Sequence, residues 1–194
     1  MRRVVLVPGL LLALVACGSG QDPGVDIAEP TTTTAAVEPG GTTTTAPAAG
    51  SGTAAVSVPP AGPAFLTEVR AAHHPGADRV VFEFEDRLPG YAVRYVEGPI
   101  TEDGSGTPVT DEGDNVLEVR MEMASGADLS ADELRQTYTG PNRIDPGTPV
   151  VTELVRTGDF EAVLTWVIGV RGRPGFNITT VTGNRLLIEI AGGD

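Results

Sequence analysis

The sequence predicts an all-β domain, an antiparallel β-sandwich or open barrel with one short helix, and three observations lead to this fold class. Apolar and polar residues alternate with period two in six segments between residues 65 and 190, which is typical of strands with one buried face. Glycine-, proline- and asparagine-containing turns separate these segments. Residues 64–194 also form a continuous stretch long enough for a single hydrophobic core.

The first strands follow this alternation closely. Phe65, Thr67, Val69 and Ala71 share the face that is expected to be buried. Four later segments repeat the pattern, with the inward-facing sets Val80, Phe82 and Phe84; Tyr91, Val93 and Tyr95; Leu117, Val119 and Met121; and Leu186, Ile188 and Ile190. Strands with one apolar face predict antiparallel sheets.

The strongest strand pattern lies between residues 160 and 170. Its expected inward face contains Phe160, Ala162, Leu164, Trp166 and Ile168. The preceding Gly158-Asp159 pair is typical of a tight turn. We therefore expect a hairpin that joins a strand over 150–156 to a strand over 160–170.

One interval has helical rather than strand character. Ser130 and Glu133 are spaced as in a capping box, in which the serine caps the first turn and the glutamate reaches back. This motif predicts a short helix from Ala131 to about Thr137, ended by Gly140-Pro141.

The N-terminus has the order of a secretory signal. Met1-Arg2-Arg3 is positive, and residues 4–16 are uncharged and rich in valine and leucine. This run is too short for a membrane-spanning helix. Its end, Leu14-Val15-Ala16-Cys17, resembles a bacterial lipobox. The resemblance implies that residues 1–16 are a lipoprotein signal peptide, cut between Ala16 and Cys17, and that the Cys17 thiol carries a diacylglyceryl group, with palmitate as an expected acyl chain.

A low-complexity segment separates Cys17 from the predicted domain. In residues 18–63, Thr, Ala, Gly, Pro and Ser make up 36 of 46 positions, and neither leucine nor an aromatic residue occurs. Such a composition buries too little apolar surface to offset the entropy of ordering. We therefore expect residues 17–63 to be a lipidated cysteine followed by a disordered tether, with the folded domain over 64–194. The runs Thr31–Thr34 and Thr42–Thr45 resemble stalks that carry O-linked sugar, and an unmodified spacer is the alternative.

Composition excludes several functions. The net charge is −13, the wrong sign for a nucleic-acid partner. All 13 basic residues are arginine, so lysine-based catalysis and a P-loop lysine are ruled out. A single cysteine provides neither a disulfide framework nor a cysteine zinc cluster. His73 and His74 are adjacent and would point to opposite faces of a strand, which disfavours a shared metal. We expect no enzyme, no cofactor and no metal.

Four residues are candidates for a binding face. Tyr138 and Arg143 flank Gly140-Pro141 in the interval without strand alternation, where loops often carry function. Glu161 points away from the predicted apolar face. Trp166 could supply the aromatic platform of a glycan site, next to the polar groups of the other three residues. The alternation, however, favours a core position for Trp166. For Arg143 and Glu161 a structural role is the alternative.

Several segments together resemble a known family. Two segments resemble the first and last strands of AMIN domains: Asp78-Arg79-Val80-Val81-Phe82-Glu83-Phe84 and Asn184-Arg185-Leu186-Leu187-Ile188-Glu189-Ile190. Leu88-Pro89-Gly90-Tyr91, Gly158-Asp159-Phe160-Glu161 and Trp166-Val167-Ile168-Gly169-Val170 are similar to the AMIN-like domain of actinobacterial lipoproteins. AMIN domains are small β-sandwiches that direct cell-wall amidases and secretins to the envelope, and some bind peptidoglycan.

The function expected from these features is a non-catalytic module anchored through Cys17 to the outer face of the cytoplasmic membrane. It would contact peptidoglycan or a wall-associated protein. The alternative is an extracytoplasmic lipoprotein that binds a small molecule or a metal, which a pocket with converging Arg and carboxylate groups would favour.

Overall fold

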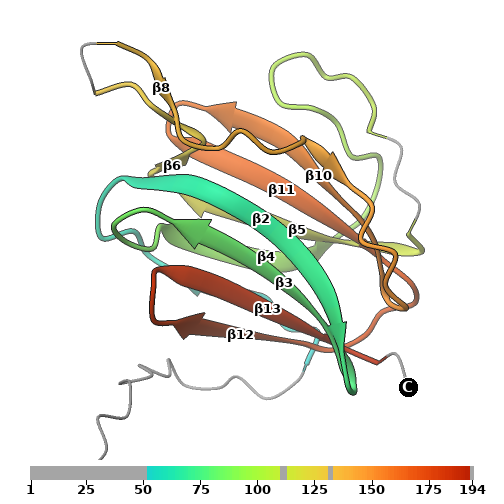
Figure 1. Cartoon of the computed structure of the whole chain (residues 1–194). Coiled ribbons are helices and arrows are strands. Elements are labelled where there is room, and N and C mark those ends of the chain that lie inside the picture. Colours follow the sequence, from blue (N-terminus) through green and yellow to red (C-terminus); the bar gives the residue numbers. More distant parts are fainter. Residues whose placement is uncertain (1–51, 110–112, 131–132, 193–194) are drawn as a thin grey trace, which may run out of the picture. The chain divides into compact units, whose positions relative to one another are not determined.

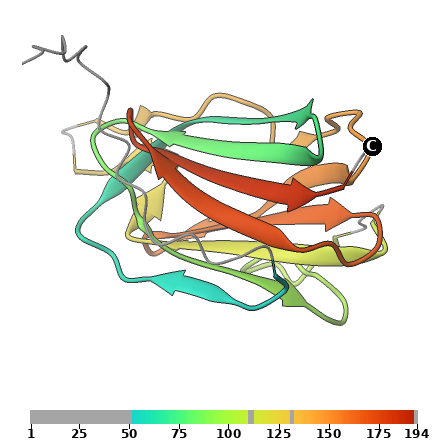
Figure 2. The ribbon, with the colours of Figure 1, turned by 90° about the horizontal axis from the view of Figure 1, so that it is seen from below.

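The computed structural model describes residues 52–109, 113–130 and 133–192. The signal peptide, Cys17 and most of the expected tether lie outside these residues. Two β-sheets pack face to face, which confirms the sandwich (Figure 1). Figure 2 shows the sheets as two layers. None of the described residues forms a helix that is long and apolar enough to cross a bilayer.

The larger sheet has six strands. Their order across the sheet is β1 (Val56–Val58), β4 (Gly90–Val96), β5 (Asn115–Glu122), β11 (Val163–Val170), β10 (Val151–Phe160) and β9 (Arg143–Ile144). All neighbouring strands in this sheet are antiparallel. The longest pairings are β10 with β11 and β11 with β5, so β11 lies in the centre of the sheet.

The second sheet has five strands, in the order β12 (Phe176–Val181), β13 (Arg185–Ala191), β3 (Ala77–Phe84), β2 (Ala64–His74) and β6 (Ala124–Ser125). Its pairs are antiparallel except β2 with β6, which is parallel. A separate hairpin of β7 (Ala127–Asp128) and β8 (Arg135–Gln136) follows β6.

The main core lies between the two sheets and contains residues that the period-two alternation predicts to face inward. Val80 and Phe82 of β3, Ile188 of β13, Val119 of β5 and Trp166 of β11 are fully buried in it. Burial of each large apolar side chain stabilises the fold by about 1.5–3 kcal/mol.

A smaller core covers the outer face of the six-stranded sheet. Val116, Val155 and Val167 are buried there, and the segment 97–109 packs against them through Ile100 and Val109. Strand β11 is therefore covered on both faces, which explains why it reads as a nearly continuous apolar run.

Strand β2 departs from the predicted alternation. A β-bulge lies between Leu66 and Glu68, and an extra residue in a strand reverses which face the side chains occupy. Leu66 and Val69 therefore point into the core, and Phe65 does not. The prediction that Phe65 shares the buried face with Val69 was wrong for this reason.

The turn before β11 also differs from the prediction. Gly158 and Asp159 lie within β10, and the hairpin turns at Glu161-Ala162, between the paired residues Phe160 and Val163. Gly158 is required by a close approach, because a Cβ at this position would collide with the Asp103 side chain. Phe160, which alternation assigned to the core, lies beside the turn and is 70% exposed.

The predicted short helix is not formed by the described part of its interval. Residues 131 and 132 lie outside the described residues, and Arg135–Gln136 form β8. The Ser130 hydroxyl and amide both donate to Asp128 Oδ1, at 2.6 and 2.9 Å, so Ser130 closes a turn on the preceding acid. A helix of about seven residues has little stability of its own, and the β7–β8 pairing replaces it.

The folded domain begins before residue 64, earlier than the sequence predicts. Val56–Val58 pair with β4 as β1, and Gly52 forms a bridge with Phe176 on the opposite sheet. The chain then passes so close to β4 that a Cβ at Gly90 would collide with Pro60. Contacts with β4 thus order a segment whose composition alone predicts disorder.

Candidate binding surfaces at the β10–β11 turn and on the outer sheet face

Trp166 lies at the centre of the core. Its side chain is 0% exposed, and its ring makes edge-to-face contacts with Phe82 and Tyr138, at centroid distances of 6.0 and 5.7 Å. Such contacts between aromatic rings add to the gain from burial. The position agrees with the core location that the alternation favours, and a ligand cannot reach the ring without opening the fold.

Tyr138 closes the core beside Trp166. It is buried, and its hydroxyl donates to the Pro141 carbonyl at 2.7 Å. Burial raises the pKa of Tyr138, while the nearby Arg156 guanidinium opposes this rise. That guanidinium lies 5.8 Å from the Tyr138 ring centroid, within the range of a cation–π contact. Tyr138 therefore acts as a packing residue.

Arg143 is the charged partner of a buried carboxylate, that of Glu153. It forms an ion pair with Glu153, whose residue exposure is only 4%, whereas half of the Arg143 side chain is exposed. A buried carboxylate needs a charged partner or hydrogen bonds. This ion pair corresponds to the structural role that was the alternative to a binding role for Arg143.

Glu161 is exposed in the two-residue turn between β10 and β11. Both turn residues have left-handed backbones, with φ of 49° at Glu161 and 59° at Ala162. Asparagine and glycine usually occupy such positions, and a left-handed residue with a side chain costs about 1–2 kcal/mol. Glu161 makes no ion pair or hydrogen bond with another described residue.

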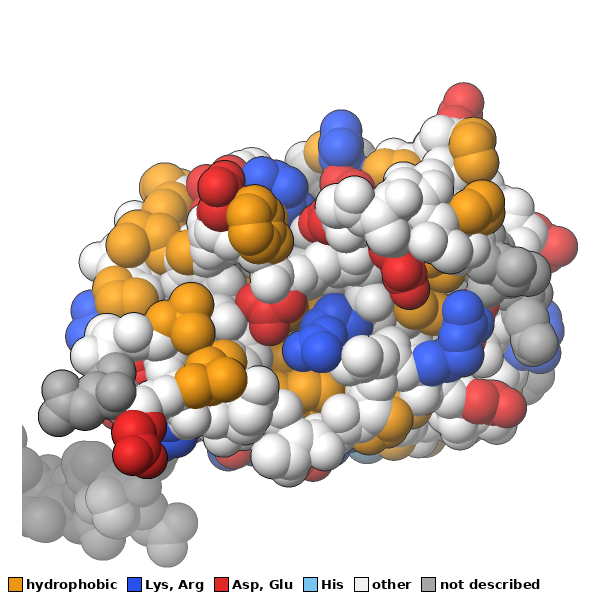
Figure 3. All heavy atoms as spheres, turned by 90° about the horizontal axis from the view of Figure 1, so that it is seen from above, with side chains coloured by type: hydrophobic (Ala, Val, Ile, Leu, Met, Phe, Trp, Pro, Cys, Tyr) orange, Lys and Arg blue, Asp and Glu red, His pale blue; other side chains and the backbone are white. Residues whose placement is uncertain are grey.

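An apolar groove of about 550 Å³ lies beside this turn, which we call the turn groove. Its apolar lining comes from three parts of the chain: Pro63 and Phe65, then Ala127 and Leu129, and the turn residues Phe160 and Ala162. Figure 3 shows hydrophobic side chains gathered on the left of the view, at this end of the sandwich. The bulge in β2 directs Phe65 here instead of into the core.

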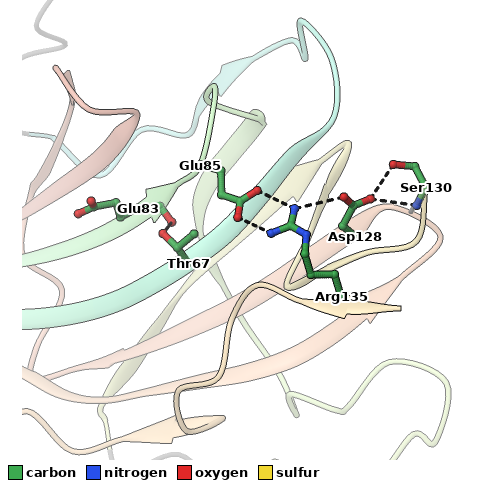
Figure 4. A network of polar contacts seen from close by, with 6 residues as sticks. All are labelled: Thr67, Glu83, Glu85, Asp128, Ser130 and Arg135. Atoms are coloured by element: carbon green, nitrogen blue, oxygen red, sulfur yellow. Dashed lines mark hydrogen bonds and ion pairs between the residues drawn. The ribbon is translucent and has the colours of Figure 1, made fainter. Parts of the chain in front are cut away.

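A polar network fixes the β7–β8 wall of the turn groove. Arg135 donates to both Glu85 carboxylate oxygens, at 2.6 and 2.9 Å, and pairs with Asp128 at 3.2 Å (Figure 4). Hydrogen bonds from Arg135 hold the pKa of Glu85 below its usual value. Hydrogen bonds from the Ser130 hydroxyl and amide, and then from Arg135, lower the pKa of Asp128. The network ties the β7–β8 hairpin to the end of β3.

Asp159 joins the turn to the aromatic pair below it. Its Oδ2 accepts a hydrogen bond from the Gly126 amide at 2.9 Å and lies 3.5 Å from the Arg156 guanidinium. Arg156 in turn covers Tyr138. The turn groove is thus anchored to the core through Asp159 and Arg156.

A second, polar surface covers the outer face of the five-stranded sheet. Arg70 pairs with Glu68 and Glu83, and Arg79 pairs with Glu189. A depression of about 310 Å³ opens on this face, lined by the side chains of Arg70, Arg79, Arg185 and His74 over an apolar floor that includes Val81 and Leu187. The charged lining of the depression is therefore basic, although each of its three arginines pairs with a glutamate beside it, which offsets their charge.

The histidine pair lies at the end of β2. His73 Nδ1 is 2.8 Å from Oδ1 of the buried Asp78, and the other Asp78 oxygen accepts from the Val150 and Val151 amides at 2.7 and 2.8 Å. His73 thus belongs to a structural contact rather than to a solvated loop. No group of three or more His, Cys, Asp or Glu side chains that could hold a metal occurs within the described residues.

The turn groove brings together residues that the sequence did not connect. Of the four candidates, only Glu161 lines the groove; Tyr138 and Trp166 are buried in the main core, and Arg143 lies on β9 in an ion pair. Phe65, Leu129 and Phe160 were not predicted as site residues. The one available signal was Phe160 next to the turn, and the alternation assigned it to the core instead.

These features define a small β-sandwich module with open surface depressions. A family model of the AMIN-like domain matches residues 64–192, more than half of the chain, and the chain therefore belongs to the AMIN-like family. No curated protein and no solved structure was found to match the chain. The AMIN-like domain indicates a cell-wall-related, non-catalytic role and an extracytoplasmic location in the cell envelope.

Proposed function

We propose that this protein is a lipid-anchored module of the cell envelope that contacts peptidoglycan or a wall-associated protein without catalysing a reaction. The observation that carries the proposal is the AMIN-like domain over 64–192, preceded by a segment that resembles a lipobox and tether. In this arrangement Cys17 holds the protein at the outer face of the cytoplasmic membrane, and the tether carries the domain toward the wall.

The exposed groups favour a protein partner over a glycan. The two aromatic rings that a glycan platform would have used, Tyr138 and Trp166, are buried. The turn groove is instead lined mainly by aliphatic and phenyl groups, which suit the apolar side chains of another protein. The acidity of the chain also opposes approach to anionic wall polymers.

The anchor is tested with the variant Cys17→Ala. We expect it to leave the membrane fraction, or to accumulate as an uncleaved precursor, and to lose labelling by radioactive palmitate. The reason is that the apolar run of residues 4–16 is too short to hold the protein in a bilayer. Ser19→Ala is the matched control and should behave as the wild type. Unchanged membrane partition of Cys17→Ala would refute lipid anchoring.

Partner choice is tested by sedimentation with purified peptidoglycan, using a chain that begins at Gly52 so that β1 is retained. Retention above that of an unrelated acidic protein would favour the glycan. Crosslinking in intact envelopes followed by co-purification tests the protein partner. Failure of both experiments would remove the contact function.

A further inference from the structure

We propose that the turn groove docks a segment of a partner protein, with an apolar side chain packed against Phe160 and a cationic side chain beside Glu161. This inference rests on the proposed function and specifies the contact that the domain makes. Four observations support it: the exposure of the apolar groups, the strained backbone at the turn, the rigid walls of the groove and its charge.

Large apolar side chains are exposed together at this end of the sandwich. Phe160 is 70% exposed and Leu129 is 77% exposed, and both line the same groove of about 550 Å³. Single exposed apolar residues are common, whereas several around one groove indicate an interaction surface. A partner side chain placed between Phe160 and Leu129 would remove both from water.

The backbone of the turn is strained in a way that displays side chains. Glu161 and Ala162 both have positive φ, and an Asn-Gly pair would form the same turn with less strain. Met123 also has positive φ, at 54°, and the next residue, Ala124, donates its amide to the Ala162 carbonyl at 3.0 Å. Three strained residues thus lie at one site, and such strain gathers where a surface is used.

The walls of the groove are held in place before any partner arrives. Arg135 fixes the β7–β8 wall to Glu85, and Asp159 ties the turn to the Gly126 amide. A preformed groove loses less conformational entropy on binding than a mobile one.

The charge of the groove indicates which kind of segment binds there. Glu161 lines the groove without an ion pair to any other described residue, whereas the second carboxylate of the lining, Asp159, is paired with Arg156. The whole chain carries a net charge of −13, so a second copy would be repelled from this acidic rim. A segment with arginine or lysine next to an apolar residue is complementary to it.

The test places a photo-crosslinker, p-benzoylphenylalanine, at position 160 of the full chain in the cells that make it. We expect adducts whose crosslinked peptide comes from another protein and carries apolar residues within a few positions of Arg or Lys. Glu161→Lys in the same chain should lower the adduct yield about tenfold, because like charges then face each other. Glu97→Lys is the matched charge control, because Glu97 follows the end of β4 that lies away from the β10–β11 turn. It should leave the adduct yield unchanged.

Two further positions make the result decisive. Leu129 carries the crosslinker as a second groove probe in case the change at 160 disturbs the hairpin, and Val58 on β1 is the exposed apolar control. Adducts to a second copy, to lipid or to glycan, or no adduct from either groove position, would overturn the proposal. Adducts from Val58 alone would show that the turn groove is not the docking site, although the domain would still contact a partner. Loss of the protein from the envelope fraction would contradict the proposed function itself.

Discussion

Two aromatic side chains on the same hairpin have opposite environments. Trp166 is fully buried against Phe82 and Tyr138, whereas Phe160 lies at the exposed turn. Trp166→Ala should lower the free energy of unfolding by about 3–5 kcal/mol, because a large cavity would open in the core. Phe160→Ala is the matched control and should change stability by no more than about 0.5 kcal/mol. Urea unfolding of both variants measures the difference, and similar losses for the two would contradict this assignment.

Asp78 links the hairpin of β2 and β3 to the start of β10 through the Val150 and Val151 amides. Burial alone would raise its pKa, but hydrogen bonds from Thr148, Val151, His73 and Val150 outweigh burial and lower the pKa below its usual 3.8. A lowered carboxyl pKa contributes stability above the unfolded-state pKa and loses it as pH falls through the folded value.

Asp78→Asn should therefore cost roughly 3 kcal/mol at neutral pH, since charged hydrogen bonds to two buried amides are lost. The difference from the wild type should begin to shrink below about pH 4, where Asp78 of the unfolded chain takes up a proton, and should shrink further as pH falls toward the lowered pKa of the folded state. Thermal melts of both chains between pH 3 and 7 test this. A difference that does not change over this range would show that ionisation of Asp78 contributes nothing to stability.

The β10–β11 hairpin has the strongest conflict between local preference and structure. Ala162 has a left-handed backbone that glycine adopts without steric cost. We expect Ala162→Gly to stabilise the domain by roughly 0.5–1 kcal/mol, the relief of strain less the added chain entropy of glycine. Gly158→Ala, on the same strand, should destabilise it, because its Cβ would collide with Asp103. A destabilising Ala162→Gly would indicate that the turn is not strained in solution.

Elements whose pattern is local were predictable from the sequence. Strands β3, β4, β5, β11 and β13 follow period-two alternation, and their inward residues are those of the core. Elements fixed by contacts distant in sequence were not. The true turn position depends on Asp103 above Gly158, and the bulge in β2 reverses the face of Phe65 without any change in composition.

The candidate site was less predictable than the fold for the same reason. Glu161 was identified from alternation, but the residues that line the groove with it come from three separate parts of the chain. In the described part of the predicted helix, residues 135–136 pair with β7 instead, and Arg135 reaches Glu85, fifty residues away in sequence. Capping residues describe a local preference and contain no information about such a partner.

At the scale of the molecule, the limit of the folded domain is open to a direct test. Strand β1 and the bridge at Gly52 show that the fold includes residues from 52 onward. Limited proteolysis should therefore leave a resistant core that begins close to Gly52, since cleavage concentrates where backbone hydrogen bonds and burial are absent. Mass spectrometry identifies the new N-terminus. A core that begins at Ala64 would contradict the pairing of β1 with β4 in solution.

Strand β1 also determines where a mechanical load would enter the domain. A chain held by its N-terminus transmits any pull to residues 52–63 before it reaches the main sheets, and β1 is held to β4 by three residue pairs. Seven residues of β4 pair with β5 on the opposite side, so β1 is the weaker attachment. Once detached and fully extended, residues 52–63 would span up to about 40 Å, at about 3.4 Å per residue, while both sheets keep their remaining pairs. The first response of the domain to tension is therefore a gain in reach rather than loss of the fold.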